Sequence, residues 1–400
     1  MPDAQRDSYG KRSGAGMIFY GLLGAATIAL ACLVNRETVC RRGAGGTVTR
    51  RQAMNGAVLF TLFLIMAGTA SLRIDVGNDY GNYVTTFHEI YVGGYVVTEP
   101  GFNLLVKLVF RLAGGENYLL VFGLFAVVTA VLFLKAMYDQ SVDFTISFAL
   151  FMLLGLYFRT FNTVRYYFVL AVTLYSLRYV LKKEYGKFIL LILFAAFFHK
   201  SVLVVIPLYL IAALPWKKWQ VILGTALAVS LPLFQNFWMA VVLKLYPSYQ
   251  NTIYLQKDTG LEGSLMGIIR CAAVLVLGLC AYRETIRDNK ANLLYFKLNL
   301  LGLALYTCAS FLPLVSRFGY YLITAHILLV PGILKNMPET SESGKSLRNK
   351  KRIMYAATAG FCLLYFVYFL MTAHQEGVRV LPYHSWIFTE KEWLNGSFIF

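Results

Sequence analysis

Long, uninterrupted runs of apolar residues, separated by short polar and basic segments, dominate the chain. A run of this kind crosses a bilayer as a helix when it holds about 18 or more residues. A helix satisfies its own backbone hydrogen bonds in lipid, and unbroken apolar runs differ from the alternating pattern of a membrane barrel. The pattern predicts an all-α, polytopic integral membrane protein with about 10–12 transmembrane helices.

The expected spans are 17–34, 53–72, 117–137, 143–158, 166–181, 219–235, 263–282, 293–313, 318–335 and 353–372. The first is interpreted as a retained span, because further spans follow and no clear cleavage site is present. Three apolar pieces are too short to cross about 30 Å: 101–113, 188–198 and 201–213. We expect the first of these as a short helix on the outer surface. The other two should form a re-entrant-like hairpin that enters from the cytoplasm and returns there.

Lysine and arginine lie mostly between the spans, and cytoplasmic loops carry an excess of these residues. The topology that best satisfies this rule places three segments outside: the large loop 73–116, the segment 236–262 and the tail 373–400. It places the basic loop 336–352 in the cytoplasm. The whole chain, 1–400, is then expected to form a single transmembrane domain in a cytoplasmic membrane.

Composition supports this interpretation, since 58% of the residues are hydrophobic and only 14% are charged. Soluble domains carry about 25% charged residues. The net charge of +17 comes from residues that flank spans and form no separate basic domain, so no nucleic-acid partner is expected. Five of the six cysteines lie in apolar runs, and neither they nor His88, His374 and His384 have metal-ligand spacing.

Three arginines are expected at the outer face: Arg159 and Arg165 flank a turn, and Arg317 opens a later span. One arginine near a span end can reach the interface by its own stem. Several on one face favour a function, because charges at membrane depth cost about 2.5–3.5 kcal/mol. Guanidinium groups match phosphate geometry, so a pyrophosphate at the lipid surface is a natural ligand.

Other polar residues also lie within or beside the spans. Arg270 lies well inside an apolar run. His199, at the tip of the expected hairpin, is interpreted either as a helix cap or as a functional group. His326 lies in the middle of a span and is interpreted as a packing residue with a hydrogen-bond partner. In the large outer loop, acidic residues alternate with aromatic residues, whose rings can stack on the faces of sugars. We assign no regular helix to residues 75–95.

Several stretches of this chain resemble the EpsG family of Wzy-like exopolysaccharide polymerases. The resemblance rests on DVGNDYGNYVTTFHEI (75–90), EPGFNLLVKLV (99–109), the stretch 159–210 with its Phe-His near the hairpin tip, SRFGYYLITAHILLVPGIL (316–334) and LPYHSW (381–386). Their order and spacing carry it, and they cover most of 75–386.

The resemblance implies an enzyme of the bacterial inner membrane that joins undecaprenyl-pyrophosphate-linked oligosaccharide repeat units at the outer face, amid membrane lipid. Chain-length regulator and flippase proteins are possible partners. The implied catalytic residues are Arg159, Arg165, Arg317, His199, Asp75 and Asp79. The implied substrate-binding residues are Tyr80, Tyr83, Glu99, Arg270, Tyr383 and His384. The three catalytic arginines would clamp the pyrophosphate, and an outer carboxylate would either hold sugar hydroxyls or take a proton.

Asp75 and Asp79 are four positions apart and do not form a DxD motif, so we expect neither a metal nor another cofactor. A flippase or other transporter of lipid-linked oligosaccharides is the main alternative, because it would hold pyrophosphate with the same arginines. Charge at several depths would favour the transporter, whereas charge at one face favours chemistry there. A membrane acyltransferase would need a histidine toward the cytoplasm, whereas His199 is expected near the outer side.

Overall fold

The computed structural model describes residues 3–35, 49–245, 262–312, 315–340, 346–374 and 378–388. Every regular element in these ranges is a helix, and β-pairing is limited there to the isolated bridges Arg73–Ser385 and Thr340–Ser346. The predicted all-α class is confirmed. The chain divides into two compact units: Met1–Tyr175, Ala195–Lys200 and Tyr355–Phe400 form the first, and Ser176–Phe194 with Ser201–Met354 form the second.

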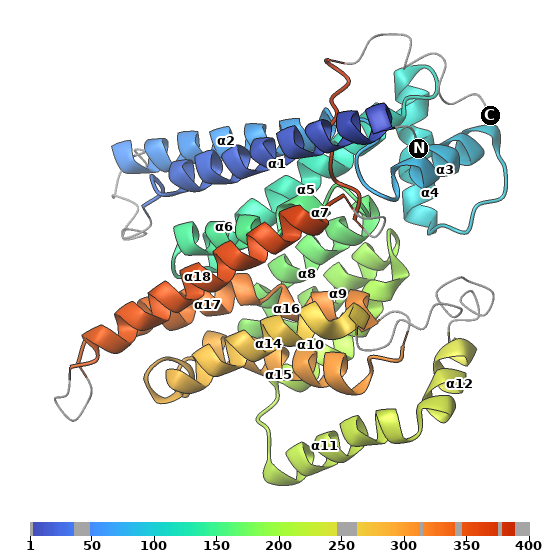
Figure 1. The fold of residues 1–400 in the computed structure, drawn as a ribbon. Helices are drawn as coiled ribbons and strands as arrows, with labels where there is room; N and C mark the ends of the chain where they lie inside the picture. The colour runs from blue at the N-terminus through green and yellow to red at the C-terminus, as the bar shows by residue number, and fades with distance from the viewer. Residues whose placement is uncertain are drawn as a thin grey trace. The chain divides into compact units, whose positions relative to one another are not determined.

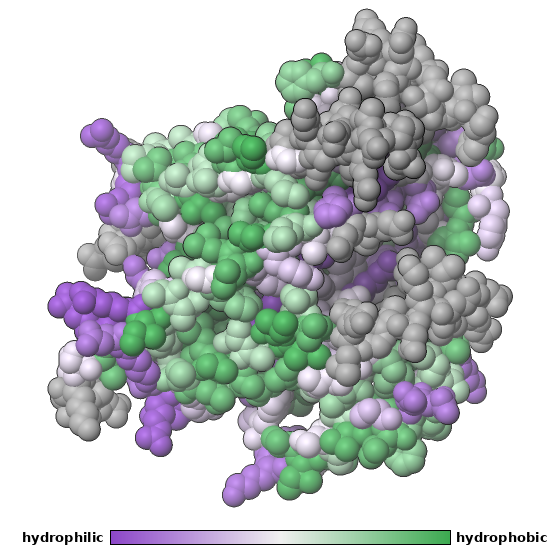
Figure 2. All heavy atoms as spheres, in the orientation of Figure 1, coloured by the Kyte–Doolittle hydropathy of each residue, from purple (hydrophilic) through white to green (hydrophobic). Residues whose placement is uncertain are grey.

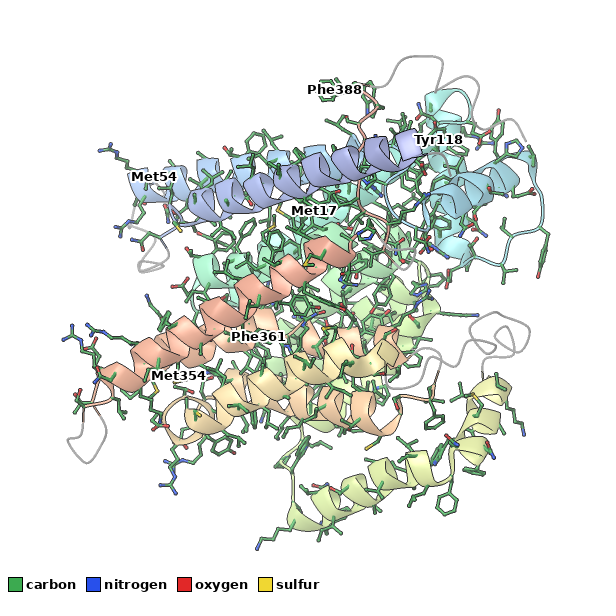
Figure 3. The ribbon with its side chains drawn as sticks, viewed as in Figure 1. Met17, Met54, Tyr118, Met354, Phe361 and Phe388 are labelled. Atoms are coloured by element: carbon green, nitrogen blue, oxygen red, sulfur yellow. The ribbon has the colours of Figure 1, made fainter. Side chains whose placement is uncertain are left out.

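The helices that belong wholly or mainly to the first unit are α1 (Asp3–Ala31), α2 (Arg50–Ser71), α3 (Tyr80–Val92), α4 (Pro100–Ala113), α5 (Tyr118–Gln140), α6 (Phe144–Leu153), α7 (Leu156–Arg159), α8 (Val164–Leu181) and α18 (Arg348–Thr372). α1 and α2 lie side by side, with α3 and α4 beside the C-terminal end of α2 (Figure 1). α2 and α5 run antiparallel, so that Met54 and Tyr118, near their two starts, lie far apart (Figure 3).

The second unit contains α9 (Tyr185–Ala196), η1 (Lys200–Val204), α10 (Val205–Ala213), α11 (Lys218–Leu233), α12 (Gln235–Leu245), α14 (Glu262–Cys280), the π-helical turn η3 (Tyr282–Ile286), α15 (Lys290–Cys308), α16 (Val315–Ile323) and α17 (His326–Asn336). α15 packs against α14, α16 and α17. Tyr306 of α15 fills the space over Gly267 and Gly319, where a Cβ atom would lie 2.5 Å and 2.2 Å from its ring. Small residues allow such close helix packing in membranes.

Local sequence explains where many helices begin and end. Asn117, Asp143 and Asn289 accept hydrogen bonds from the first turns of α5, α6 and α15. Such side chains satisfy N–H groups that have no partner within the helix. α3 and α4 end at Gly93 and Gly114, which adopt the left-handed conformation that favours glycine.

Four described helices are long and apolar enough to cross a membrane: Arg50–Ser71, Tyr118–Gln140, Val315–Asn336 and Arg348–Thr372. A fifth span is added if Lys218–Leu233 and Gln235–Lys244, which meet at 94°, count as one. Figure 2 shows hydrophobic side chains exposed along α1, α2 and α18 and hydrophilic ones near the basic starts of α2 and α18, as lipid-facing helices require. The chain is thus a multi-pass membrane protein, whereas the larger span count and the single-domain assignment stay predictions.

Two expected segments differ from the structure. Residues 143–158 form two helices, because Gly155 adopts a φ of +69° beside the ring of Phe369 and ends α6. The expected span 219–235 corresponds to α11, and the chain bends by 94° at the end of this helix, where α12 follows. Residues 348–352 of the expected basic loop 336–352 already belong to α18, and 341–345 lie outside the described residues.

The short hairpin is confirmed as a helical pair. The ring of Phe188 in α9 stacks on Tyr209 in α10, with centroids 6.0 Å apart, so the two arms fold back on each other. The tip residues Ala195–Lys200 belong to the first unit. There the Gly101 N–H donates to the Phe197 carbonyl oxygen at 3.0 Å. A Cβ at Gly101 would lie 2.8 Å from that oxygen, so the start of α4 needs glycine to approach the tip.

We predict that Gly101→Ala separates α4 from the hairpin tip. The added methyl group meets backbone, which cannot rotate away, and overpacking of this kind costs about 1–3 kcal/mol. Thermal unfolding of the detergent-solubilised protein, followed by intrinsic fluorescence, should show a lower midpoint. Gly81→Ala is the matched control, because Gly81 is also the second residue of its helix and has nothing within 4 Å. Equal midpoints for the two variants would contradict the close approach.

Candidate functional site

Glu99, the residue before α4, is the centre of a cluster in the first unit. Its Oε2 accepts a hydrogen bond from Nη1 of Arg165. Its Oε1 accepts one from the main-chain N–H of Lys200 at 3.0 Å and lies 3.5 Å from Nδ1 of His199. All three interacting side chains are largely buried, with exposed fractions of 12% for Glu99, 17% for Arg165 and 11% for His199. One carboxylate therefore joins the start of α4, the start of α8 and the hairpin tip.

The surroundings of Glu99 keep its carboxylate ionised. Burial alone would raise the pKa of Glu99, but the interactions with His199, with Arg165 and with the Lys200 N–H outweigh burial and lower it to about 2. A depressed pKa means that the ionised carboxylate contributes stability above its ordinary pKa of 4.5 and that this contribution is lost as the pH falls toward about 2. At neutral pH, Glu99 is an anchor for cations and a weak base.

Aromatic rings hold the guanidinium of Arg165 in place. Its central carbon lies 4.7 Å from the ring centroid of Phe102 and 5.7 Å from that of Tyr83. The Arg165 main-chain N–H also reaches the Tyr83 hydroxyl oxygen at 3.4 Å. Cation–π contacts of this kind become stronger where water is excluded. The ion pair and the rings together fix the direction of the guanidinium fork.

α3 contradicts the expectation that residues 75–95 lack a regular helix. Tyr80, Tyr83 and Phe87 fall on its buried face, and Tyr80 stacks on Phe122 with centroids 4.6 Å apart. Their spacing of three and four residues is the helical signal that the sequence offered. Both tyrosines are at most 5% exposed, so the geometry gives them a supporting role. Their contact with substrate stays a prediction.

Asp79 lies against the turn that separates the two predicted catalytic arginines, Arg159 and Arg165. The hydroxyl of Thr163 donates to Oδ2 of Asp79 at 2.7 Å, and the Asp79 N–H donates to Oδ1 of Asn162 at 2.8 Å. A Cβ at Gly77 would lie 2.5 Å from the Phe161 carbonyl oxygen, so glycine allows the 75–79 loop to approach this turn. The structure thus brings Asp79 next to the Arg159–Arg165 turn, while their membership of one site stays a prediction.

Asp75 has a different partner from Asp79. Nη2 of Arg379 donates to Oδ1 of Asp75 at 2.7 Å, and both side chains are a little over one-third exposed. The surrounding backbone pairs as well, since the Gly77 N–H donates to Arg379 and the Ile74 N–H donates to His384. The late segment 378–386 therefore lies along residues 72–78. Sequence reasoning missed Arg379, which is 304 positions from its partner.

The remaining predicted residues of the first unit occupy varied positions. Arg159 lies over the ring of Phe369, 5.4 Å from its centroid, and is half-buried. The Tyr383 hydroxyl donates to the Thr69 carbonyl at 2.9 Å, and its ring stacks on Phe19. The His384 side chain is exposed, and its carbonyl accepts the Ile74 hydrogen bond. Substrate contact by Tyr383 and His384 stays a prediction.

Two predicted residues belong to the second unit. Arg317 is half-buried on α16. Arg270, on α14, is only 2% exposed and lies 5.6 Å from the ring centroid of Tyr320. His326 is buried and bonds through Nε2 to Oδ1 of Asn299 at 2.7 Å, which confirms its interpretation as a packing residue. Because Arg317 lies in the other unit, its membership of one clamp with Arg159 and Arg165 stays a prediction.

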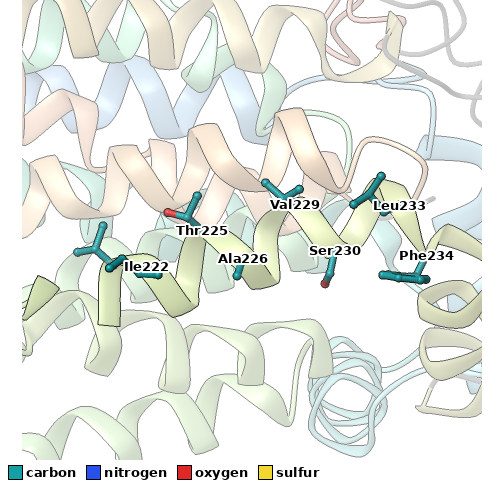
Figure 4. Close-up of a pocket in the computed structure, with 8 residues that line it drawn as sticks. Ile222, Thr225, Ala226, Val229, Ser230, Leu233 and Phe234 are labelled. Atoms are coloured by element: carbon teal, nitrogen blue, oxygen red, sulfur yellow. The ribbon is translucent and has the colours of Figure 1, made fainter. Parts of the chain in front are cut away.

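An apolar groove of about 590 Å³ runs along α11 in the second unit (Figure 4). Its lining is formed by side chains such as Val221, Ile222, Val229 and Leu233, and it contains no titratable group. None of the predicted site residues lines it. Across the described ranges, no three His, Cys, Asp or Glu residues gather as metal ligands would.

The sequence of the chain matches the EpsG family over residues 56–385. The protein belongs to the EpsG family. This span includes most of α2, the 75–79 loop, the Arg159–Arg165 turn, the hairpin and most of the 378–386 segment. No match was found among curated proteins or among solved structures. Membership supports a role in exopolysaccharide synthesis for this EpsG-family protein.

We predict that Glu99→Gln destabilises this EpsG-family protein by about 1–3 kcal/mol, because an amide of similar size leaves the Arg165 guanidinium without its counter-charge. A double-mutant cycle with Arg165→Gln, measured by unfolding in detergent, should return a favourable coupling energy of similar size. Between about pH 4.5 and pH 2, the parent should lose a component of stability that the Glu99→Gln variant lacks.

Glu184→Gln is the matched control for this experiment. Glu184 pairs with Lys187 at 3.0 Å, but both side chains are at least one-third exposed. Exposed pairs contribute about 0.2–1 kcal/mol. A coupling energy for Glu99 and Arg165 no larger than that of the exposed pair would contradict the anchoring role.

Proposed function

We propose that this protein is a polysaccharide polymerase that joins undecaprenyl-pyrophosphate-linked oligosaccharide repeat units at the outer face of a bacterial inner membrane. The observation that supports the proposal most is the cluster in which Glu99 holds Arg165 and His199 next to the loop of Asp79. Four segments that are distant in the sequence supply it: the 73–116 loop, the Arg159–Arg165 turn, the hairpin tip and the 378–386 segment. The predicted topology assigns all of them to the outer side.

In the proposed reaction, a hydroxyl oxygen of the incoming unit attacks the anomeric carbon of the growing chain. A new C–O bond forms, the bond from that carbon to the pyrophosphate oxygen breaks, and lipid pyrophosphate leaves with the electron pair. Negative charge develops on the leaving group, so fixed cations there lower the barrier. Arg165 suits this role because the ion pair and the rings of Phe102 and Tyr83 fix it in advance. Arg159 and Arg317 are proposed to complete the clamp.

The proton of the attacking sugar hydroxyl needs an acceptor. The contacts of each nearby side chain indicate which of them can accept this proton. Glu99, with a pKa of about 2, is a poor general base at neutral pH. We therefore assign Glu99 a positioning role. His199 and Asp79 remain as proposed proton acceptors or as holders of the acceptor sugar. His199 is oriented by Glu99 and by Tyr166, whose ring meets the imidazole edge-on at 5.8 Å.

We predict that the purified protein converts a synthetic lipid-pyrophosphate-linked repeat unit into a ladder of longer products, and that EDTA leaves the ladder unchanged. Arg165→Ala and Arg317→Ala should each lower the turnover number by about 100-fold or more, since loss of one charge-stabilising donor costs about 100- to 1,000-fold. Gel electrophoresis of labelled product measures the effect.

Arg111→Ala is the matched control, because Arg111 is exposed in the last turn of α4 and should leave the ladder intact. Buried Arg270 in α14 is the observation that favours a transporter instead, since charge within spans often marks a transport pathway. Folded parent protein that makes no ladder but moves the lipid carrier across proteoliposomes would replace the polymerase by that alternative.

A further inference from the structure

Arg73 is a buried cation to which neither the sequence reasoning nor the proposed reaction gives a role. It follows α2 and precedes the 75–79 loop, and its side chain is only 1% exposed. Its Nη1 donates to the Ala70 carbonyl oxygen. Its guanidinium carbon lies 5.1 Å from the ring centroid of Phe122 and 5.5 Å from that of Phe161. Phe161 belongs to the turn between Arg159 and Arg165, so Arg73 lies directly against that turn.

No carboxylate among the described residues balances the charge of Arg73, and its Nε and Nη2 atoms have no hydrogen-bond partner there. Tyrosines surround it instead. The hydroxyls of Tyr20, Tyr157 and Tyr383 donate to main-chain carbonyl oxygens at 2.7–2.9 Å, which leaves their oxygen lone pairs to face a cation. Burial lowers the pKa of Arg73, and these neighbouring oxygens oppose that effect. Dipoles can solvate a charge in this way without cancelling it.

A small cavity of about 10 Å³ separates Arg73 from Thr129 of α5 and from Thr160 and Val164 of the turn. A cavity of this size holds about one water molecule and is too small for a phosphate group. The cavity can therefore satisfy an N–H group of Arg73, but it cannot hold a polyatomic counter-ion. An anionic ligand attracted by Arg73 therefore lies outside this cavity, on the face of the Arg159–Arg165 turn that points away from Arg73.

The charges around this turn show what Arg73 adds. Glu99 pairs with Arg165, and Asp75 pairs with Arg379, so these four charges cancel. Asp79 contributes one negative charge, and Arg159 contributes one positive charge. Lys200 at the hairpin tip adds one positive charge, but its side chain is exposed and is therefore screened by water. Arg317 belongs to the second unit and is not counted here. Without Arg73, the buried and half-buried charges named above sum to zero whenever His199 is neutral. A lipid pyrophosphate ester carries more than one negative charge, and a neutral site attracts it weakly.

We propose that Arg73 adds a buried, poorly screened positive charge to the site and thereby selects a diphosphate ligand through its electric field, without touching it. The inference rests on the proposed function, because it assumes that the Arg159–Arg165 turn faces the diphosphate. A charge buried among apolar rings is poorly screened, so it acts across the turn at an effective dielectric constant of about 20 instead of about 80. A second negative charge on the ligand doubles the effect.

The test measures equilibrium binding of geranylgeranyl diphosphate, geranylgeranyl monophosphate and geranylgeraniol to the full-length protein in detergent. Arg73→Met removes the charge, and Arg73→Lys keeps it. We expect Arg73→Met to weaken diphosphate binding by about 10- to 100-fold, to weaken monophosphate binding less and to leave the alcohol unchanged. Arg73→Lys should stay within about threefold of the parent for all three ligands.

A second pair of variants leaves Arg73 in place, in case its removal prevents folding. Thr129→Asp puts a carboxylate into the cavity, where it cancels the guanidinium charge, and Thr129→Asn is the uncharged control of equal size. We expect Thr129→Asp to repeat the loss of diphosphate selectivity and Thr129→Asn to bind like the parent. Thermal unfolding confirms that each variant is folded.

Three outcomes overturn the inference. If folded Thr129→Asp and Arg73→Met bind the diphosphate as tightly as the parent, Arg73 has no electrostatic role, while the proposed function stands. If they weaken all three ligands equally, Arg73 acts through the structure alone. If the parent itself shows no preference for the diphosphate over the alcohol, the proposed pyrophosphate site fails together with the inference.

Discussion

The ion pair between Glu99 and Arg165 is the interaction on which the candidate site depends. A largely buried guanidinium needs a partner, because uncompensated charge away from water is costly. Glu99 supplies it with one oxygen and uses the other to hold Lys200 and His199 of the hairpin tip. One carboxylate thus satisfies Arg165 and fixes α4, α8 and the tip against one another. The close approach at Gly101 makes the same junction compact.

Much of this arrangement follows from the sequence because topology limits where segments can meet. Apolar runs indicated the helices, and the distribution of basic residues indicated which connections share a face. Arg165, His199 and Asp79 could therefore be proposed as neighbours before their contacts were known. The same reasoning missed α3, since acidic and aromatic residues in a long connection were taken as loop. The spacing of Tyr80, Tyr83 and Phe87 indicates a helix. In the structure these three side chains lie on the buried face of α3, where Tyr83 contacts Phe102 and Tyr80 stacks on Phe122.

Other features depend on pairings that no local pattern encodes. Arg379 pairs with Asp75, although the two residues are separated by most of the chain. The 378–386 segment lies along residues 72–78 through backbone hydrogen bonds, which any residues could make. No pattern in the sequence distinguishes Arg73 from any basic residue at the end of a span, whose stem can reach the interface. Only the rings of Phe122 and Phe161 and the surrounding tyrosines show that it is buried instead. Helix breaks such as the left-handed Gly155 are equally hard to predict, because hydropathy does not change there.

The chemistry of the site follows from this division of its charges. A carboxylate with a pKa of about 2 cannot both anchor Arg165 and accept a proton efficiently at neutral pH, so Glu99 is committed to holding the cation. Asp79 bonds to Thr163 and Asn162, which are both neutral, and no cation pairs with its carboxylate among the described residues. Paired charges fix the geometry of the site, whereas the role proposed for Arg73 is to add a buried positive charge to it. Both properties are what the proposed reaction needs, because an anionic leaving group departs there while an uncharged sugar hydroxyl is held nearby.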